Sequence, residues 1–196
     1  MEFSDVVHKR RMVRHFAADA VDPAAIDRIL DAAKHAPSAG FTQGQSFVVV
    51  TTPETKQAIA KLCGEEFYVA GGFHAFISEA PVLLIPCTSE AAYHRRYQEA
   101  DKVEDDGTEI VWPVPYWHMD IGCSVMLVLL AVVAEGLAAG FAGAHDLDAL
   151  RELLHIPVEV TPVGVIPVGH PAPDVPSPSL KRGRKATTDF VHREQW

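Results

Sequence analysis

The chain contains few cysteines, and their arrangement excludes two classes of small protein. Among 196 residues there are three, Cys63, Cys87 and Cys123, an odd number with no C-x-x-C spacing. A disulfide scaffold and a zinc knuckle both need paired cysteines. All three lie in apolar stretches, where cysteine acts as a small hydrophobe. We therefore expect free thiols and a reducing, cytoplasmic setting.

The sequence also lacks the motifs of common catalytic and nucleotide-binding sites. No G-x-G-x-x-G follows an expected strand, and neither a P-loop nor an H-E-x-x-H occurs. The 10 histidines show no paired metal spacing, so no metal site is expected. Gly122-Cys123-Ser124 has neither the second glycine nor the preceding strand of a nucleophile elbow. No catalytic side chain is predicted, so if the protein is an enzyme, a cofactor carries the chemistry.

Long hydrophobic runs are absent as well. The N-terminal stretch up to Arg14 is polar and basic, unlike a signal peptide. The longest uncharged apolar run, between Asp120 and Glu135, holds 14 residues, which is short for a bilayer core of about 30 Å at ~1.5 Å per residue. We expect a buried helix there and no membrane contact.

Positive charge is scarce but concentrated. The formal net charge is −9, from 17 basic and 26 acidic residues, which disfavours nucleic acids and anionic membranes as partners. Eight of the 17 cations nevertheless fall in two short segments. These are Lys9, Arg10, Arg11 and Arg14 near the start, and Lys181, Arg182, Arg184 and Lys185 near the end. Two cationic clusters in an acidic chain indicate a small anionic ligand.

Expected helices and strands are interspersed along the chain, which favours one layered α/β (α+β) domain over residues 1–196. Asp22-Pro23 and Thr52-Pro53 are helix starts, each with a capping residue before a first-turn proline. Short apolar runs such as PVLLIPC predict buried strands. The expected helices span 23–36, 53–62, 89–100, 118–138 and 146–154, and the expected strands 47–51, 81–87 and 162–169. Residues 171–196 are predicted to form a C-terminal arm that begins with four spaced prolines.

The helix expected over 118–138 is apolar on every face rather than along one stripe. A domain of this size has difficulty covering such a helix alone. We expect a second copy of the chain to cover one side of it, which predicts a homodimer.

Four segments, taken in order, resemble motifs of one known family. Arg10-Arg11-Met12-Val13-Arg14 resembles an opening R-R-x-x-R, and residues 36–47 (APSAGFTQGQSF) resemble A-P-S-x-x-N-x-Q-P-W-x-F ahead of an edge strand. Residues 135–143 (EGLAAGFAG) are similar to a Gly-Leu-Gly loop, and residues 181–192 (KRGRKATTDFVH) to a C-terminal basic run. The chain thus resembles the nitroreductase family of FMN-dependent flavoproteins over nearly its whole length, in a form similar to an actinobacterial branch.

The resemblance implies a nitroreductase-like central sheet flanked by helices, a long buried helix in a dimer interface, and FMN bound non-covalently. The arginine segments are implied to bind the phosphate and ribityl chain. A loop of the second subunit is implied to meet the flavin ring, and the residues after the long helix to lie over the pyrimidine edge and N5. In that order, the implied cofactor-binding residues are Arg10, Arg11, Met12, Arg14, Arg182 and Arg184; Pro37, Ser38, Ala39 and Gln43; and Phe141, Ala142, Gly143 and Ala144.

The sequence departs from the family pattern near the expected substrate site. Phe41 stands where the family has Asn, Gly44-Gln45 where it has Pro-Trp, and Met12 where it often has Ser. These departures concern the substrate more than the fold. Five aromatic residues either roof the site or pack in the dimer, and both interpretations stay open. They are Tyr93 and Tyr97, on an expected surface helix, and Trp112, Tyr116 and Trp117, in an expected loop.

The activity that the resemblance implies is ping-pong hydride transfer. The donor is NADH or NADPH, and the acceptor is a small molecule such as a nitroaromatic compound or a quinone. One alternative is a non-enzymatic flavin-binding or flavin-storage protein. Another keeps the fold but changes the chemistry to reductive dehalogenation, flavin fragmentation or deazaflavin-dependent reduction. The sequence does not choose between NADH, NADPH and a reduced deazaflavin as the electron donor.

Overall fold

The computed structural model describes residues 1–196, with a five-stranded sheet at its centre. The strands are β1 (Gln45–Val50), β2 (Val82–Thr88), β3 (Ala138–Ala139), β4 (Thr161–Pro162) and β5 (Ile166–Gly169). Their order is β1-β2-β5-β3, β4 also pairs with β2, and every strand pair is antiparallel. The helices are α1 (Phe3–Lys9), α2 (Pro23–Ala33), α3 (Pro53–Leu62), α4 (Glu65–Ala70), α5 (Glu90–Arg96), α6 (Tyr116–Ala134) and α7 (Leu147–Leu153).

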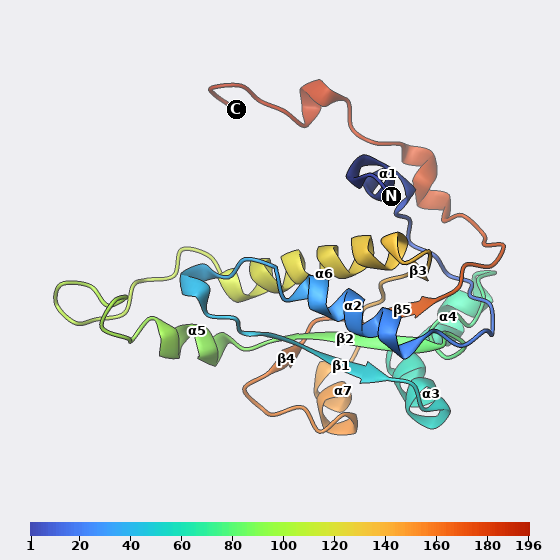
Figure 1. The fold of residues 1–196 in the computed structure, drawn as a ribbon, viewed down its shortest axis with the longest axis horizontal. Helices are drawn as coiled ribbons and strands as arrows, with labels where there is room; N and C mark the ends of the chain where they lie inside the picture. The colour runs from blue at the N-terminus through green and yellow to red at the C-terminus, as the bar shows by residue number, and fades with distance from the viewer.

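Strand β2 divides the core in two, because successive side chains of a strand point to opposite faces. Leu83, Ile85 and Cys87 pack with α3 and α7 on one face. Val82 and Leu84 pack with α2 and α6 on the other. All seven residues of β2 are buried, as its apolar run predicts. The result is the expected layered α+β domain, with helices on both sides of the sheet (Figure 1).

Helices α2 and α3 begin at the predicted residues, and α5 and α7 begin one residue after the predicted 89 and 146. Asp22 and Asp146 each accept a hydrogen bond from a backbone N–H of the first turn, at 3.0 and 2.9 Å. Pro53 is the first residue of α3, although Thr52 before it makes no side-chain cap to the backbone. These local signals were readable because a capping side chain and a first-turn proline act within a few residues.

Other expectations were wrong. The apolar run over 47–51 predicts a buried strand, but in β1 only Val50 is buried; β1 is an edge strand, as the family resemblance implies. The strand expected over 162–169 is two strands, separated by a stretch in which Val165 pairs with Ala142 instead. Helix α5 is not simply a surface helix, since Tyr93 is fully buried. Helices α1 and α4, of 7 and 6 residues, were not predicted, because they are short and neither a capping side chain nor a first-turn proline marks their start.

The long helix α6 begins and ends earlier than expected. It starts at Tyr116, inside the expected aromatic loop, and ends at Ala134, shortly before Gly136 turns the chain with a φ of 77°. By length and composition alone, the 19 residues of α6 are enough to cross a membrane. The sequence-based estimate counted only the 14 uncharged residues between Asp120 and Glu135, which are too few. One side of α6 packs against α2 and the sheet as part of the core.

The other side of α6 carries apolar side chains that nothing in the chain covers. Met119 is 55% exposed and Met126 is 47% exposed, and Cys123 between them is also exposed. Positions three or four apart lie on one helix face, so these residues form one stripe, which we call the α6 stripe. Cys123 therefore differs from Cys63 and Cys87, whose burial raises their thiol pKa values to about 12 and about 11.

Candidate functional site

Two segments from opposite ends of the sequence line one cavity. The residues after α1 run beside β3, where Val13 N donates to Ala139 O at 3.0 Å. The C-terminal arm passes the same segment, where Ala172 N donates to His15 O at 3.2 Å. The cavity between them has a volume of about 460 Å³, and its lining includes Arg10, Arg11, Met12, Arg14 and Arg184. Arg182 is exposed and does not belong to this lining. We call this site the arginine cavity.

Arg14 is held from two directions at the arginine cavity. Its backbone N–H donates to Asp174 Oδ2 at 2.8 Å, and Asp174 is itself a lining residue. Its guanidinium carbon lies 5.2 Å from the ring centroid of Phe73 and 5.9 Å from that of Phe76, in cation–π contact. None of the four arginines in the lining takes part in an ion pair. Their charges are available to an anion, and Arg forks match phosphate oxygens well.

The residues expected over the flavin N5 continue directly from β3. Ala142 is buried, and its N–H and C=O both pair with Val165, at 2.9 and 2.8 Å. Its backbone is thus already occupied. The N–H groups of Phe141, Gly143 and Ala144 donate to no other backbone group of the chain. Since Met12 forms a bridge with Ala139, this stretch lies beside the arginine segment.

The expected flavin-ring contacts Pro37, Ser38, Ala39 and Gln43 lie in the loop 37–44, which has an unusual backbone. Gly40, Phe41 and Gln43 have φ values of 61°, 53° and 53°, in the left-handed region that residues other than glycine rarely adopt. Gln43 N donates to Ser38 Oγ at 2.9 Å, across the turn. Ala39 N donates to Asp120 Oδ2 at 2.9 Å, which attaches the loop to the first turns of α6.

Within one chain, the loop 37–44 and the arginine cavity do not meet. The loop is bound to Asp120, near the start of α6. Arg11 and Val13 border a second cavity together with Val133 and Gly136, at the end of the same helix. The 13 residues from Asp120 to Val133 rise roughly 20 Å along α6 at ~1.5 Å per residue. The ribbon shows α6 running along the length of the sheet between the two places (Figure 1).

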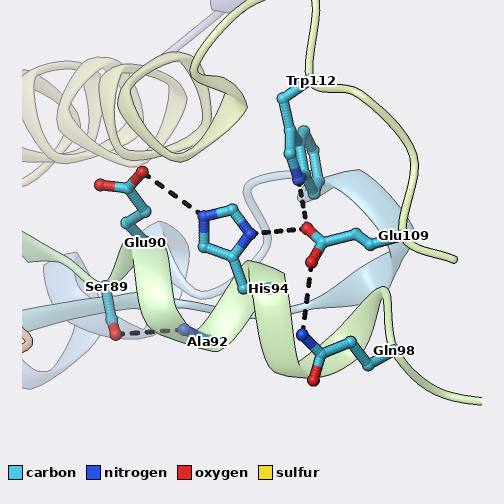
Figure 2. Close-up of polar contacts among 7 residues, drawn as sticks. All are labelled: Ser89, Glu90, Ala92, His94, Gln98, Glu109 and Trp112. Carbon is cyan, nitrogen blue, oxygen red and sulfur yellow. Dashed lines mark hydrogen bonds and ion pairs between the residues drawn. The ribbon is translucent and has the colours of Figure 1, made fainter.

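A polar network joins α5 to the segment 97–115, which connects it to α6. Figure 2 shows Glu109 at its centre, accepting hydrogen bonds from Trp112 Nε1 at 2.6 Å, His94 Nδ1 at 2.6 Å and Gln98 Nε2 at 3.4 Å. The Trp112 indole and then His94 hold the pKa of Glu109 below its ordinary value. Glu109 in turn raises the pKa of His94.

The aromatic residues of this region pack mainly on one another. The ring centroid of Trp112 lies 4.4 Å from that of Tyr97, 5.8 Å from that of Trp117 and 6.0 Å from that of Tyr116. Tyr93 lies 6.2 Å from Trp112 and is fully buried. These contacts explain the cluster as a small core under the segment 97–115. A further role as a roof over a bound acceptor stays a prediction.

The structure is a layered α+β protein with four arginines, none of them in an ion pair, around one cavity. A family model, described as the nitroreductase family, matches residues 7–170. The chain belongs to the nitroreductase family, and with it to the oxidoreductases.

Two relatives and one solved structure give the scale of the similarity. A protein of Methanothermobacter thermautotrophicus, provisionally named an NADH dehydrogenase/NAD(P)H nitroreductase, is 27% identical over all of this chain and 88% of its own length. An iodotyrosine deiodinase of Haliscomenobacter hydrossis is 27% identical over 97% of this chain and 89% of its own. A crystal structure of an iodotyrosine deiodinase bound to FMN and 3-iodo-L-tyrosine shares the fold, with a TM-score of 0.70 and 22% identity over 90% of this chain and 93% of that one.

Several residues at the candidate site carried no signal in the sequence. Phe73 and Asp174 become contacts of Arg14 only through the fold. In the sequence Asp120 marks the border of an apolar run, whereas in the structure its buried carboxylate anchors the loop 37–44. A charged residue at the edge of an otherwise uncharged helix could have raised the question of its partner, since buried carboxylates need hydrogen-bond donors.

Proposed function

We propose that the protein binds FMN at the arginine cavity and catalyses hydride transfer from NADH or NADPH to a small acceptor. The observation that carries this proposal is the convergence of Arg10, Arg11, Arg14 and Arg184 on one cavity in a chain of net charge −9. A phosphate monoester with a charge of about −2 at pH 7 suits such a donor set. Bound FMN would supply the hydride chemistry, for which the chain itself offers no catalytic side chain.

The chain's own residues have separate tasks in this proposal. The four arginines hold the phosphate, and Asp174 fixes the backbone of Arg14 among them. Phe141, Gly143 and Ala144 present N–H groups that donate to no other backbone group, beside the arginine segment. We assign them to the edge of the flavin ring, where a donor stabilises developing negative charge.

The proposal includes a homodimer formed through the α6 stripe. Met119, Cys123 and Met126 leave one side of α6 uncovered, as an interface with a second copy requires. In a two-fold dimer with antiparallel α6 helices, the start of one α6 lies beside the end of the other. The loop 37–44 of one chain then reaches the arginine cavity of its partner, which supplies the contact that one chain lacks.

The test begins with the absorption spectrum of the purified protein. We expect a yellow protein with one FMN per subunit, released by acid, and a dimer by light scattering. NADH or NADPH should then be oxidised steadily when menadione or a nitrofuran is added. A protein that stays colourless with added FMN contradicts the cofactor proposal. A flavin-loaded protein without turnover of any acceptor favours the storage alternative.

A second candidate is reductive dehalogenation of a halogenated phenol. The similarity to the iodotyrosine deiodinase of Haliscomenobacter hydrossis, over 97% of this chain, favours it. The two candidates differ in product. Iodide release from 3-iodotyrosine by the dithionite-reduced protein supports dehalogenation, whereas menadione turnover without iodide release supports the quinone and nitro reductase activity.

A further inference from the structure

Asp120 is a buried carboxylate with an unusual set of partners. It is 7% exposed, lies in the first turns of α6, and takes part in no ion pair. Both of its hydrogen bonds go to one oxygen: Tyr93 OH donates to Oδ2 at 2.8 Å and Ala39 N donates to the same atom at 2.9 Å. Burying a carboxylate is costly unless donors replace its hydrogen bonds to water. The Tyr93 hydroxyl and the Ala39 N–H are the donors that offset this cost at Asp120.

What Asp120 holds is the turn with the least regular backbone in the loop 37–44. Ala39 precedes Gly40 and Phe41, both in the left-handed region. On the other side of the same turn, Arg96 Nε donates to Gly40 O at 2.9 Å. The guanidinium of Arg96 is itself fixed by a bidentate pair with Asp101, at 2.7 Å for each bond. Two charged side chains therefore hold one peptide turn from α6 and from α5.

Burial within the chain does not account for this anchoring. The 3-10 turn over 39–41 contributes no buried residue, and Phe41 at its tip is 76% exposed. A left-handed backbone persists at a surface loop only where surrounding contacts over-determine it, and such loops are characteristic of ligand sites. Polar contacts thus fix the backbone of a loop whose own side chains stay outside the core.

We propose that Asp120 is a positioning residue for the cofactor site of the partner subunit. It fixes the N–H of Ala39, and with it the backbone from Ser38 to Gln43, in the form that meets the flavin ring across the dimer. This inference rests on the proposed function, because the flavin contact and the dimer belong to that proposal. The attachment of Ala39 to Asp120 is independent of both and can be tested without flavin.

The arrangement of the two bonds allows a sharp pair of substitutions. Because both donors bind the same oxygen, Asp120→Asn can keep both bonds with its single carbonyl oxygen and removes only the charge. Asp120→Ala removes both bonds. If Asp120→Ala does not fold, Ala39→Pro removes the N–H donor, while also fixing φ, and is tested by FMN affinity. The extended backbone of Ser38 (φ −143°, ψ 142°) is compatible with a following proline.

The first measurement is amide hydrogen exchange at Ala39 in the flavin-free protein. We expect exchange to be about tenfold or more faster in Asp120→Ala and unchanged in Asp120→Asn. Unchanged exchange in Asp120→Ala would show that the carboxylate does not hold the loop, and would overturn the proposal. This readout stands even if the wild-type protein binds no FMN, a result that would contradict the proposed function and the flavin part of this inference together.

The second measurement is FMN affinity, together with the visible circular dichroism of the bound flavin. We expect Asp120→Ala to raise the Kd about tenfold and to change the dichroism, and Asp120→Asn to restore both. Asp22→Ala is the control, because Asp22 also accepts a backbone N–H but caps α2 and lies in neither the loop nor the arginine cavity.

Three results would overturn the positioning role. Equal losses of affinity in Asp120→Asn and Asp120→Ala would assign the effect to the charge instead of the loop. A lower Tm in Asp120→Ala with unchanged Kd and dichroism would leave Asp120 a purely structural residue. The same loss of affinity in Asp22→Ala would make it a general effect of stability.

Discussion

The lining of the arginine cavity predicts different roles in FMN binding for Arg182 and Arg184, two positions apart in the sequence. Arg184 lines the cavity, whereas Arg182, from the same motif, does not. Both are exposed residues of the C-terminal arm. A charge-assisted hydrogen bond to a phosphate contributes about 1.5–3 kcal/mol. We therefore expect Arg184→Ala to weaken FMN binding by roughly 10- to 150-fold, at ~1.4 kcal/mol per decade. Arg182→Ala should change it by less than about threefold, as expected of a surface substitution away from the site.

Arg14→Ala should weaken FMN binding to a similar degree but also lower the stability of the protein. Unlike Arg184, Arg14 packs on Phe73 and Phe76, and cation–π contacts contribute about 0.5–1 kcal/mol at exposed sites. The thermal midpoint should therefore fall in Arg14→Ala and stay unchanged in Arg184→Ala. Comparing the two variants separates the charge from the packing.

The assay is a fluorescence titration of flavin-free protein with FMN and, in parallel, with riboflavin. Riboflavin lacks the phosphate, so its affinity should be nearly the same in wild type, Arg182→Ala and Arg184→Ala. Equal loss of FMN and riboflavin affinity in Arg184→Ala would mean that the arginine supports structure. Equal loss of FMN affinity in Arg182→Ala and Arg184→Ala would mean that the motif, not the cavity, identifies the phosphate contacts. Unchanged FMN affinity in both Arg14→Ala and Arg184→Ala would refute the phosphate site.

Three further predictions concern the dimer, the loop and the segment 97–115. In the proposed dimer Cys123 should resist a thiol reagent, and it should become reactive when the protein is diluted to monomer. Cys63 and Cys87 should stay unreactive until the protein unfolds. A rate of Cys123 modification that does not depend on protein concentration would argue against the interface. Gly40→Ala should lower the unfolding free energy by at least about 1–2 kcal/mol, because φ is 61° and the new Cβ would lie 2.7 Å from Tyr97 Cε2. An unfolding free energy from chemical denaturation that lies within about 0.5 kcal/mol of wild type would contradict the described turn. The charged His94–Glu109 pair should stabilise the segment most between the ordinary pKa values of Glu and His, about 4.3 and 6.5, where both groups are charged. This contribution should be lost as pH falls through the lowered pKa of Glu109, and as pH rises through the raised pKa of His94. Exchange of the Trp112 indole N–H should accordingly accelerate over that range more than base catalysis alone predicts, and the absence of any excess over Glu109→Gln would refute the coupling.

The parts of the fold that were predicted are those set by local chemistry. The run PVLLIPC specifies a strand buried on both faces, and β2 is buried along its whole length. Asp22-Pro23 and Asp146 specify helix starts through hydrogen bonds within one turn. What failed depends on distant partners. β3 and β4 have two residues each and exist only because β5 and β2 pair with them, and β1 is exposed because it lies at the sheet edge.

The candidate site shows the same division. Charge clustering identified the segments that hold Arg14 and Arg184, because two cationic clusters in an acidic chain are visible in composition. Which members of each cluster face the cavity depends on how the arm crosses the first segment, so Arg182 could not be separated from Arg184 by sequence. Asp120 was not recognised because its partners, Ala39 and Tyr93, come from a loop and a helix far from it in sequence.

Helix α6 connects the folding problem with the problem of the site. The sheet and α2 cover one side of α6 and leave Met119 and Met126 exposed on the other. The same helix separates the loop 37–44, bound at Asp120, from the cavities near Val133 by about two thirds of its length. A two-fold partner on the α6 stripe answers both difficulties at once, because it covers the exposed side and brings the start of one helix to the end of the other. A substitution that breaks this interface should therefore remove flavin binding along with the dimer, even though every arginine of the phosphate site remains in place.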